Sequence, residues 1–136
     1  MTQGNNTLII GYGSQAKVWA DNLKDSGYSI SIGLRVNSSS AKIANNNDHK
    51  VYFYQEASKI LFDTIVILTP DHTHLEIIDS IQDKVHEGTR VVYAHGYSLV
   101  AKNIPQKYPN FSHLLLAPKA IASEMRELYI NKLPIP

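Results

Sequence analysis

A strand-like run that ends in glycine and passes directly into a helix-like run restricts the fold of this chain more than any other feature. The segment reads IIGYGSQAKVWADNL over residues 9–23, with Gly11 and Gly13 between its apolar and amphipathic halves. The amphipathic half places its apolar residues on one helical stripe, at Ala16, Trp19, Ala20 and Leu23. A strand, a tight turn and a helix in this order are typical of the unit that connects parallel strands.

The same alternation continues along the chain, because short apolar runs bounded by turn residues recur between helical patterns. We predict strands at Thr7–Ile10, Ser29–Leu34, Val51–Phe53, Thr64–Leu68, Arg90–Tyr93 and Ser112–Leu116. We predict helices at Ser14–Ser26, Gln55–Leu61 and His72–Lys84, and a loop with a short helix at Val36–Asn47. Since parallel crossovers are right-handed, the expected fold is α/β, a single-domain, Rossmann-like doubly wound parallel sheet in strand order 3-2-1-4-5-6.

Length and composition exclude several classes of protein. The 136 residues suit one domain over 1–136, and the absence of cysteine excludes disulfides and thiolate metal sites. A net charge of +1 indicates neither a nucleic-acid partner nor an anionic membrane. The polar start MTQGNNT lacks the order of a signal peptide, and no apolar run approaches the ~20 residues of a membrane span. We therefore expect a cytoplasmic protein.

The glycine turn predicts a dinucleotide site. Residues 11–16, GYGSQA, fit the pattern G-x-G-x-x-G/A after a strand and at the start of a helix. Gly11 allows the tight turn, Gly13 leaves room for a pyrophosphate beside the backbone, and the small Ala16 lets the helix pack on the strand. The helix N-terminus then favours the phosphate charge. The alternative is a glycine turn that binds no ligand.

The end of the second predicted strand favours NADP over NAD. NAD-binding domains usually place an acidic residue about 20 residues after the glycines, to accept a hydrogen bond from the ribose 2′-hydroxyl. Here that strand ends in Arg35, and the first carboxylate to follow is Asp48. Arg35 can pair with a 2′-phosphate, to which Ser38 and Ser40 can donate hydrogen bonds. The alternative is an arginine in an ordinary solvated loop.

Several motifs together resemble one family. GYGSQ, GLR followed by serines, TPDHTH, YAHGY and LAPK occur in this order over nearly the whole chain. They resemble the N-terminal, NADP-binding domain of ketol-acid reductoisomerase, also called acetohydroxy acid isomeroreductase. The resemblance implies an oxidoreductase of branched-chain amino acid biosynthesis that isomerises an acetohydroxy acid with Mg²⁺ and reduces the product with NADPH.

The resemblance also implies functional residues. It implies cofactor contacts at Tyr12, Gly13, Ser14 and Gln15, in addition to Gly11 of the glycine motif. It implies 2′-phosphate contacts at Arg35, Ser38 and Ser40, and further cofactor contacts at Asp71, His72, Thr73 and His74. It implies that His95 and Lys119 are catalytic. Both follow the carboxyl ends of predicted strands, where a histidine could relay protons and a lysine could steady an oxyanion.

Two departures from the family pattern bear on the activity. The family continues APK with a Gly-Pro-Gly-like turn, where this sequence has Ala120, Ile121 and Ala122. The family's Mg²⁺ ligands are carboxylates of a helical C-terminal domain, and we expect no such domain within this sequence. We therefore expect no metal bound by this chain, and a domain that is not catalytically complete by itself.

Other functions remain open on the sequence. TPDHTHLEI also resembles the glucose-fructose oxidoreductase type, so the chain could be the cofactor domain of another oxidoreductase. It could also be a stand-alone nucleotide-binding or assembly module without catalysis. A homodimer formed through an exposed apolar flank is a further expectation.

Overall fold

The sheet is parallel and six-stranded, and it has the order β3-β2-β1-β4-β5-β6, so the predicted topology is confirmed. The computed structural model describes residues 6–56, 61–94, 112–115 and 122–132. The strands are β1 (Asn6–Ile10), β2 (Ser29–Leu34), β3 (Lys50–Phe53), β4 (Phe62–Ile67), β5 (Val85–Tyr93) and β6 (Ser112–Leu115). The helices are α1 (Ser14–Asp25), α2 (Ser40–Asn46), α3 (His74–Ser80) and α6 (Ala122–Ile130), with short 3₁₀ turns at Asp71–Thr73 and Gln82–Lys84.

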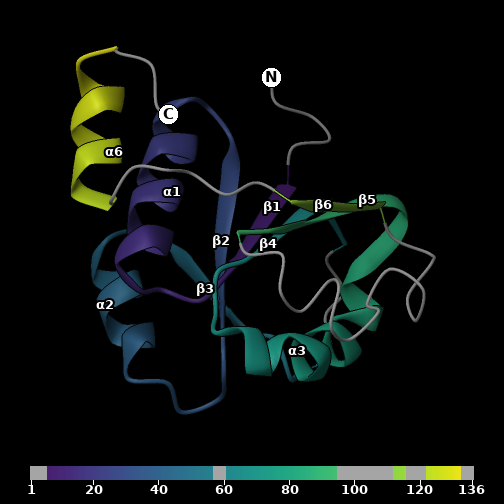
Figure 1. Ribbon diagram of the computed structural model, residues 1–136. Coiled ribbons are helices and arrows are strands. Elements are labelled where there is room, and N and C mark those ends of the chain that lie inside the picture. Colours follow the sequence, from purple (N-terminus) through teal and green to yellow (C-terminus); the bar gives the residue numbers. More distant parts are fainter. Residues whose placement is uncertain (1–5, 57–60, 95–111, 116–121, 133–136) are drawn as a thin grey trace.

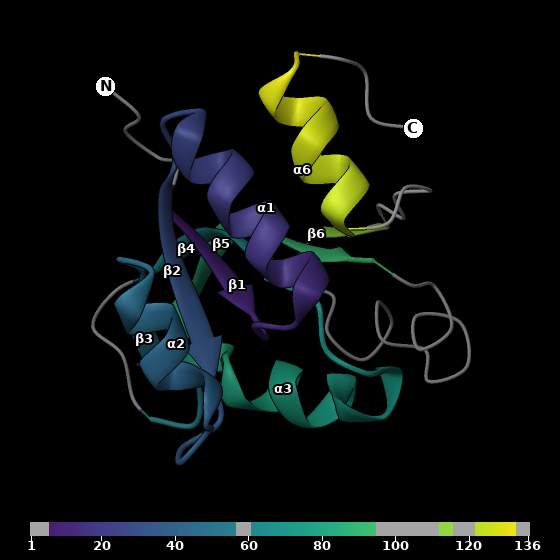
Figure 2. The same cartoon turned by 90° about the vertical axis from the view of Figure 1, so that its left-hand side faces the viewer.

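Helices cover both faces of the sheet. Figures 1 and 2 show α1, α2 and α6 on one face and α3 on the other, with α6 lying beside α1. Successive side chains of a strand point to opposite faces. Leu8 and Ile10 therefore join the core cluster under α3, whereas Ile9 joins the cluster under α1 and α2. Burial on both faces explains why β1 is a continuous apolar run.

The connection between β4 and β5 differs from the prediction of one helix over His72–Lys84. It consists of a 3₁₀ turn, α3 and a second 3₁₀ turn. Side chains take over the last carbonyl groups of α3, because Gln82 Nε2 donates to the Ile78 oxygen at 2.8 Å and Lys84 Nζ reaches the Ser80 oxygen at 3.4 Å. The helix therefore ends before Ile81, its C-cap residue.

The buried side of this connection also differs in part from the apolar spacing of the sequence, which predicts that Leu75, Ile78, Ile81 and Val85 face inward. Leu75 and Val85 are only partly buried, while Ile78 and Ile81 are fully buried as expected. His74 and Ile77, which the apolar pattern did not select, are buried as well. Of the helix predicted at Gln55–Leu61, Gln55 lies in a turn, Glu56 in a bend, Leu61 in no regular element, and 57–60 fall outside the described residues.

Strand β5 begins earlier than its predicted start at Arg90. Its pairing with β4 shifts register between Phe62 and Thr64. Thr89 spans this irregularity, since its buried hydroxyl donates to the Phe62 oxygen at 2.8 Å and accepts from the His86 amide at 2.9 Å.

Within the described part of the chain, no helix is long and apolar enough to cross a bilayer.

Candidate functional site

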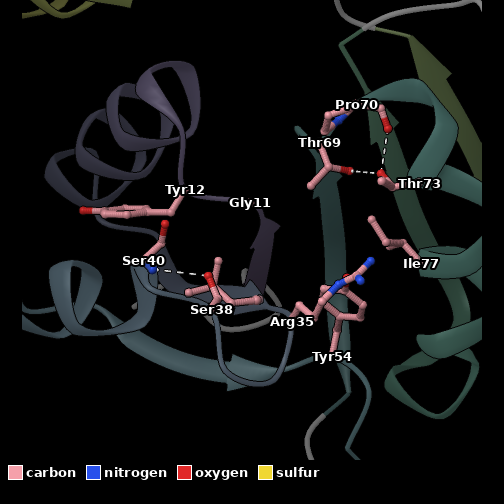
Figure 3. Close-up of a pocket in the computed structure, with 12 residues that line it drawn as sticks. Gly11, Tyr12, Arg35, Ser38, Ser40, Tyr54, Thr69, Pro70, Thr73 and Ile77 are labelled. Carbon is pink, nitrogen blue, oxygen red and sulfur yellow. Dashed lines mark hydrogen bonds between the residues drawn. The ribbon is translucent and has the colours of Figure 1, made fainter.

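A pocket opens at the carboxyl edge of the sheet, where β1 lies between β2 and β4. Its volume is about 240 Å³. Its lining comes from the ends of four neighbouring strands and from the start of the α3 connection: Gly11, Tyr12, Gly33, Leu34, Arg35, Ser38, Ser40, Tyr54, Thr69, Pro70, Thr73 and Ile77 (Figure 3). The strand order reverses beside β1, and this is the position at which open parallel sheets bind ligands.

The two glycines of the turn serve different purposes. Gly11 has φ +106°, and a Cβ there would lie 3.1 Å from the Leu68 oxygen and 3.2 Å from Thr69 Cγ2. The fold itself therefore requires glycine at position 11. Gly13 has φ −75°, which any residue adopts, and its Cβ would meet nothing within 4 Å. The protein leaves open the space beside Gly13, as expected where a ligand approaches the backbone closely.

Tyr12 borders the pocket, but its ring is buried between α1 and α2. The phenol oxygen accepts a hydrogen bond from Asn47 Nδ2 at 2.8 Å, and the ring meets the edge of His49 at a centroid distance of 5.9 Å. Only 5% of the residue is exposed. These contacts fix the turn from Gly11 to Gly13, after which α1 begins at Ser14. Ser14 is exposed and Gln15 half-buried in the first turn of α1, and neither lines the pocket.

The loop from Arg35 to Ser40 forms the second wall. It folds as a turn in which the Ser38 amide donates to the Arg35 oxygen at 3.0 Å and the Ser40 amide reaches the Ser38 hydroxyl at 3.3 Å. The Gln55 side chain holds the loop from outside, because its Oε1 accepts from the Val36 amide at 2.9 Å. The predicted residues Arg35, Ser38 and Ser40 thus line one pocket, with Ser38 between Ser40, beside Tyr12, and Arg35, beside Tyr54 (Figure 3).

Arg35 is an exposed cation with two neighbours that favour its charge. The Tyr54 hydroxyl and then the Glu76 carboxylate raise the pKa of Arg35 above its usual value. Figure 3 places the Arg35 and Tyr54 side chains together, on the side of the pocket that Ile77 also lines. The guanidinium is therefore a permanent positive charge at the mouth of the pocket, which suits it to hold an anionic group.

The third wall follows β4. Thr73 fixes it, since its hydroxyl donates to the Pro70 oxygen at 2.6 Å and lies 2.8 Å from the Thr69 hydroxyl (Figure 3). Of the other residues predicted in this segment, His72 is exposed and does not line the pocket, and Asp71 belongs to the 3₁₀ turn.

His74 lies away from the pocket surface. It is fully buried, its Nε2 donates to the Thr69 oxygen at 3.0 Å, and its ring lies 5.8 Å from that of Tyr93. It therefore supports the wall of the pocket from behind. The two residues predicted to be catalytic, His95 and Lys119, lie outside the described residues.

Sequence reasoning missed several lining residues. Tyr54 lies outside every quoted motif, whereas Thr69 and Ile77 lie within TPDHTHLEI but were not among the residues selected from it. The sequence did indicate Tyr54 and Thr69, because each directly follows the carboxyl end of a predicted strand, as Arg35 does. Within the described ranges, no group of three histidine, aspartate or glutamate side chains is placed to hold a metal ion.

Known proteins resemble this chain over its whole length. The family described as acetohydroxy acid isomeroreductase, NADPH-binding domain, matches residues 1–136. A ketol-acid reductoisomerase (NADP(+)) from Psychrobacter cryohalolentis is 36% identical over 137 residues, which cover 100% of this chain and 40% of the relative. The protein of the same name from Psychrobacter arcticus is 35% identical with the same coverage. The chain thus spans 40% of the length of these curated relatives.

Solved structures share the fold. An NADH-preferring ketol-acid reductoisomerase from an uncultured archean has a TM-score of 0.76 at 24% identity, over 99% of this chain and 42% of that one. A 3-hydroxyisobutyrate dehydrogenase from Mycobacterium tuberculosis has a TM-score of 0.74 at 9% identity, over 90% of this chain and 43% of that one. At such identities these two structures support the architecture alone.

Proposed function

This chain belongs to the acetohydroxy acid isomeroreductase family, as its NADPH-binding domain, and from that premise we propose that the pocket binds NADP(H) through Gly13 and Arg35. The observation that carries the proposal is the pairing of two features at one edge of the sheet, because Gly13 directly follows the pocket-lining residues Gly11 and Tyr12, and Arg35 lines the pocket itself. One is an open space beside the glycine that precedes α1, and the other is a permanent cation at the end of β2. They suit the pyrophosphate and the 2′-phosphate of one cofactor.

The pyrophosphate lies at the N-terminus of α1 in this proposal. The helix runs from Ser14 to Asp25, and its first-turn amides have no carbonyl partners within the helix. Such amides and the helix dipole attract phosphate. A Cβ at position 13 would occupy the open space, so glycine there permits the phosphate oxygens to approach the backbone.

The 2′-phosphate lies at Arg35. Its guanidinium presents several donors in a plane that matches phosphate oxygens, and Ser38 and Ser40 of the same loop also line the pocket. Asp71, His72 and Thr73 follow the end of β4, and we assign them to the side of the cofactor that faces this strand. We assign His74 a supporting role behind them, since it is fully buried.

The reaction of the whole enzyme is part of the same proposal. The relatives named above are ketol-acid reductoisomerases, and this chain matches 40% of their length. We propose that the domain supplies NADPH for the reduction of an isomerised acetohydroxy acid, with His95 relaying protons and Lys119 steadying oxyanion charge. The Mg²⁺ of the isomerisation would then be held by residues outside this domain.

Cofactor titrations of the chain and an Arg35→Gln variant test the proposal. NADPH and NADH are titrated by calorimetry, or by the fluorescence of Trp19, the single tryptophan. The variant should bind NADPH roughly tenfold or more weakly, because it loses a charge-assisted contact, while NADH binding should hardly change. Raising the salt concentration should weaken NADPH binding more than NADH binding, because Arg35 is exposed and salt screens its charge.

The matched control is Arg90→Gln. Arg90 is an exposed arginine of β5 that does not line the pocket, so its loss should leave both affinities unchanged. Failure of the unaltered chain to bind either cofactor would refute dinucleotide binding. If Arg35→Gln weakened NADPH binding and NADH binding equally, the 2′-phosphate assignment would be refuted.

A further inference from the structure

The cation that would hold the 2′-phosphate already has a carboxylate beside it. Arg35 Nη2 lies 3.4 Å from both Glu76 Oε1 and Glu76 Oε2. The two residues are 41 positions apart, one in the loop after β2 and the other in α3. Their side chains are 55% and 53% exposed, so the contact lies at the mouth of the pocket and not in the core.

The backbone of Glu76 is held at this position. Its neighbours Ile77 and Ile78 are at most 1% exposed and join the core cluster beneath α3. Ile77 also lines the pocket. The Ser80 hydroxyl donates to the Glu76 backbone oxygen at 2.8 Å within the helix. Glu76 can therefore swing its side chain, but its backbone cannot leave the mouth of the pocket without exposing the apolar face of α3.

We propose that Glu76 is a specificity-determining residue, which competes with the 2′-phosphate of NADP(H) for Arg35 and thereby lowers the preference for NADP(H) over NAD(H). The inference rests on the proposed function, because it requires the phosphate to bind at Arg35. It adds a residue that neither the glycine turn nor the loop after β2 contains.

The competition follows from the donors involved. Glu76 uses the outer nitrogen Nη2, which is also a donor that a bound phosphate requires for a paired contact. When NADPH binds, the carboxylate must leave Arg35 or remain close to a second anion, and both cost free energy. When NADH binds, the ribose carries a neutral hydroxyl and the pair stays intact. The cost therefore falls on one cofactor only.

The size of the effect is set by the exposure of the pair. Exposed ion pairs contribute little, since water and salt screen them. Loss of the competing carboxylate should therefore tighten NADPH binding roughly two- to fivefold and change NADH binding by less than about 1.5-fold. Arginine is protonated at neutral pH whatever its neighbours, so the guanidinium remains a cation when Glu76 is absent.

The test is the ratio of the two dissociation constants in Glu76→Gln. Calorimetric titrations with NADPH and with NADH give this ratio for the unaltered chain and for the variant. Glu127→Gln is the matched control, because it removes one exposed carboxylate of α6, which packs beside α1 away from the pocket. The dissociation constant for NADPH divided by that for NADH should fall in Glu76→Gln and stay constant in Glu127→Gln.

A double variant separates competition from a general charge effect. In the background of Arg35→Gln, the gain from Glu76→Gln should disappear, because the contested cation is absent. A gain of the same size in that background, or equal changes for both cofactors, would overturn the inference while leaving NADPH binding at Arg35 in place. If Arg35→Gln weakened NADPH binding and NADH binding equally, the 2′-phosphate would not lie at Arg35. That result would overturn the 2′-phosphate assignment of the proposed function, and the inference with it.

Discussion

Replacement of Gly13 by alanine is expected to leave the fold intact and to weaken NADPH binding strongly. The backbone at position 13 has φ −75° and ψ −173°, and a Cβ there meets nothing within 4 Å. Alanine is a poorer N-cap than glycine by about 0.5–1 kcal/mol. It also loses less chain entropy on folding, which offsets about 0.4–1 kcal/mol. The net change in stability should therefore be within about 0.5 kcal/mol.

The matched variant Gly11→Ala should behave in the opposite way. With φ +106°, an alanine at this position is strained by about 1–3 kcal/mol. Its Cβ would also lie 3.1 Å from the Leu68 oxygen, closer than ordinary contacts allow. We expect a loss of at least about 2 kcal/mol, which lowers Tm by roughly 6–10 °C in a domain of this size.

Two measurements check these variants. Thermal unfolding followed by circular dichroism, without ligand, should give Gly13→Ala a Tm within about 2 °C of the unaltered chain. Calorimetry should then give Gly13→Ala an NADPH affinity at least about tenfold lower, because a methyl group fills the space of the pyrophosphate. Unchanged NADPH binding by Gly13→Ala would refute the phosphate site, and an unchanged Tm of Gly11→Ala would refute the argument from backbone strain.

Two further predictions concern stability. Lys84 is 1% exposed, and its Nζ donates to the Tyr54 oxygen at 2.9 Å and the Glu56 oxygen at 2.8 Å. Lys84→Met should cost about 2–3 kcal/mol in urea unfolding, because these carbonyl groups lose their donor, and a cost below about 1 kcal/mol would contradict this. Arg126 joins α6 to α1 through Asn22 Oδ1 at 2.6 Å and Asp25 Oδ2 at 2.8 Å. Arg126→Ala should cost about 1 kcal/mol and speed amide exchange in α6 several-fold, whereas uniform exchange over the whole domain would speak against a local contact.

Much of the architecture could be predicted because it depends on local patterns. Strands buried on both faces are continuous apolar runs, so five of the six strands were predicted to within two residues at each end, while β5 begins five residues before its predicted start. The strand order followed from the handedness of parallel connections. The helix over His72–Lys84 was wrong in extent, because its apolar spacing does not reveal that Gln82 and Lys84 take the last carbonyl groups of α3.

The candidate site was predictable only in part. The glycine turn and Arg35 carry their own signatures in the sequence, and the structure brings Gly11, Arg35, Ser38 and Ser40 to one pocket. The roles of His95 and Lys119 stay predictions, since both lie outside the described residues. Tyr54 was missed although it directly follows a predicted strand, and Ile77 was missed because nothing in its own neighbourhood distinguishes a pocket wall from an ordinary buried residue.

The glycine turn, the alternation of strands and helices, and the cation at the end of β2 can be read from the amino-acid sequence. Each of these depends on backbone freedom, burial pattern or residue type within a short stretch of chain. The contact between Glu76 and Arg35, which are 41 residues apart, and the place of Tyr54 beside them emerge only in the folded molecule. These contacts depend on how α3 and the strand ends pack at the sheet edge, and that packing depends on the whole chain.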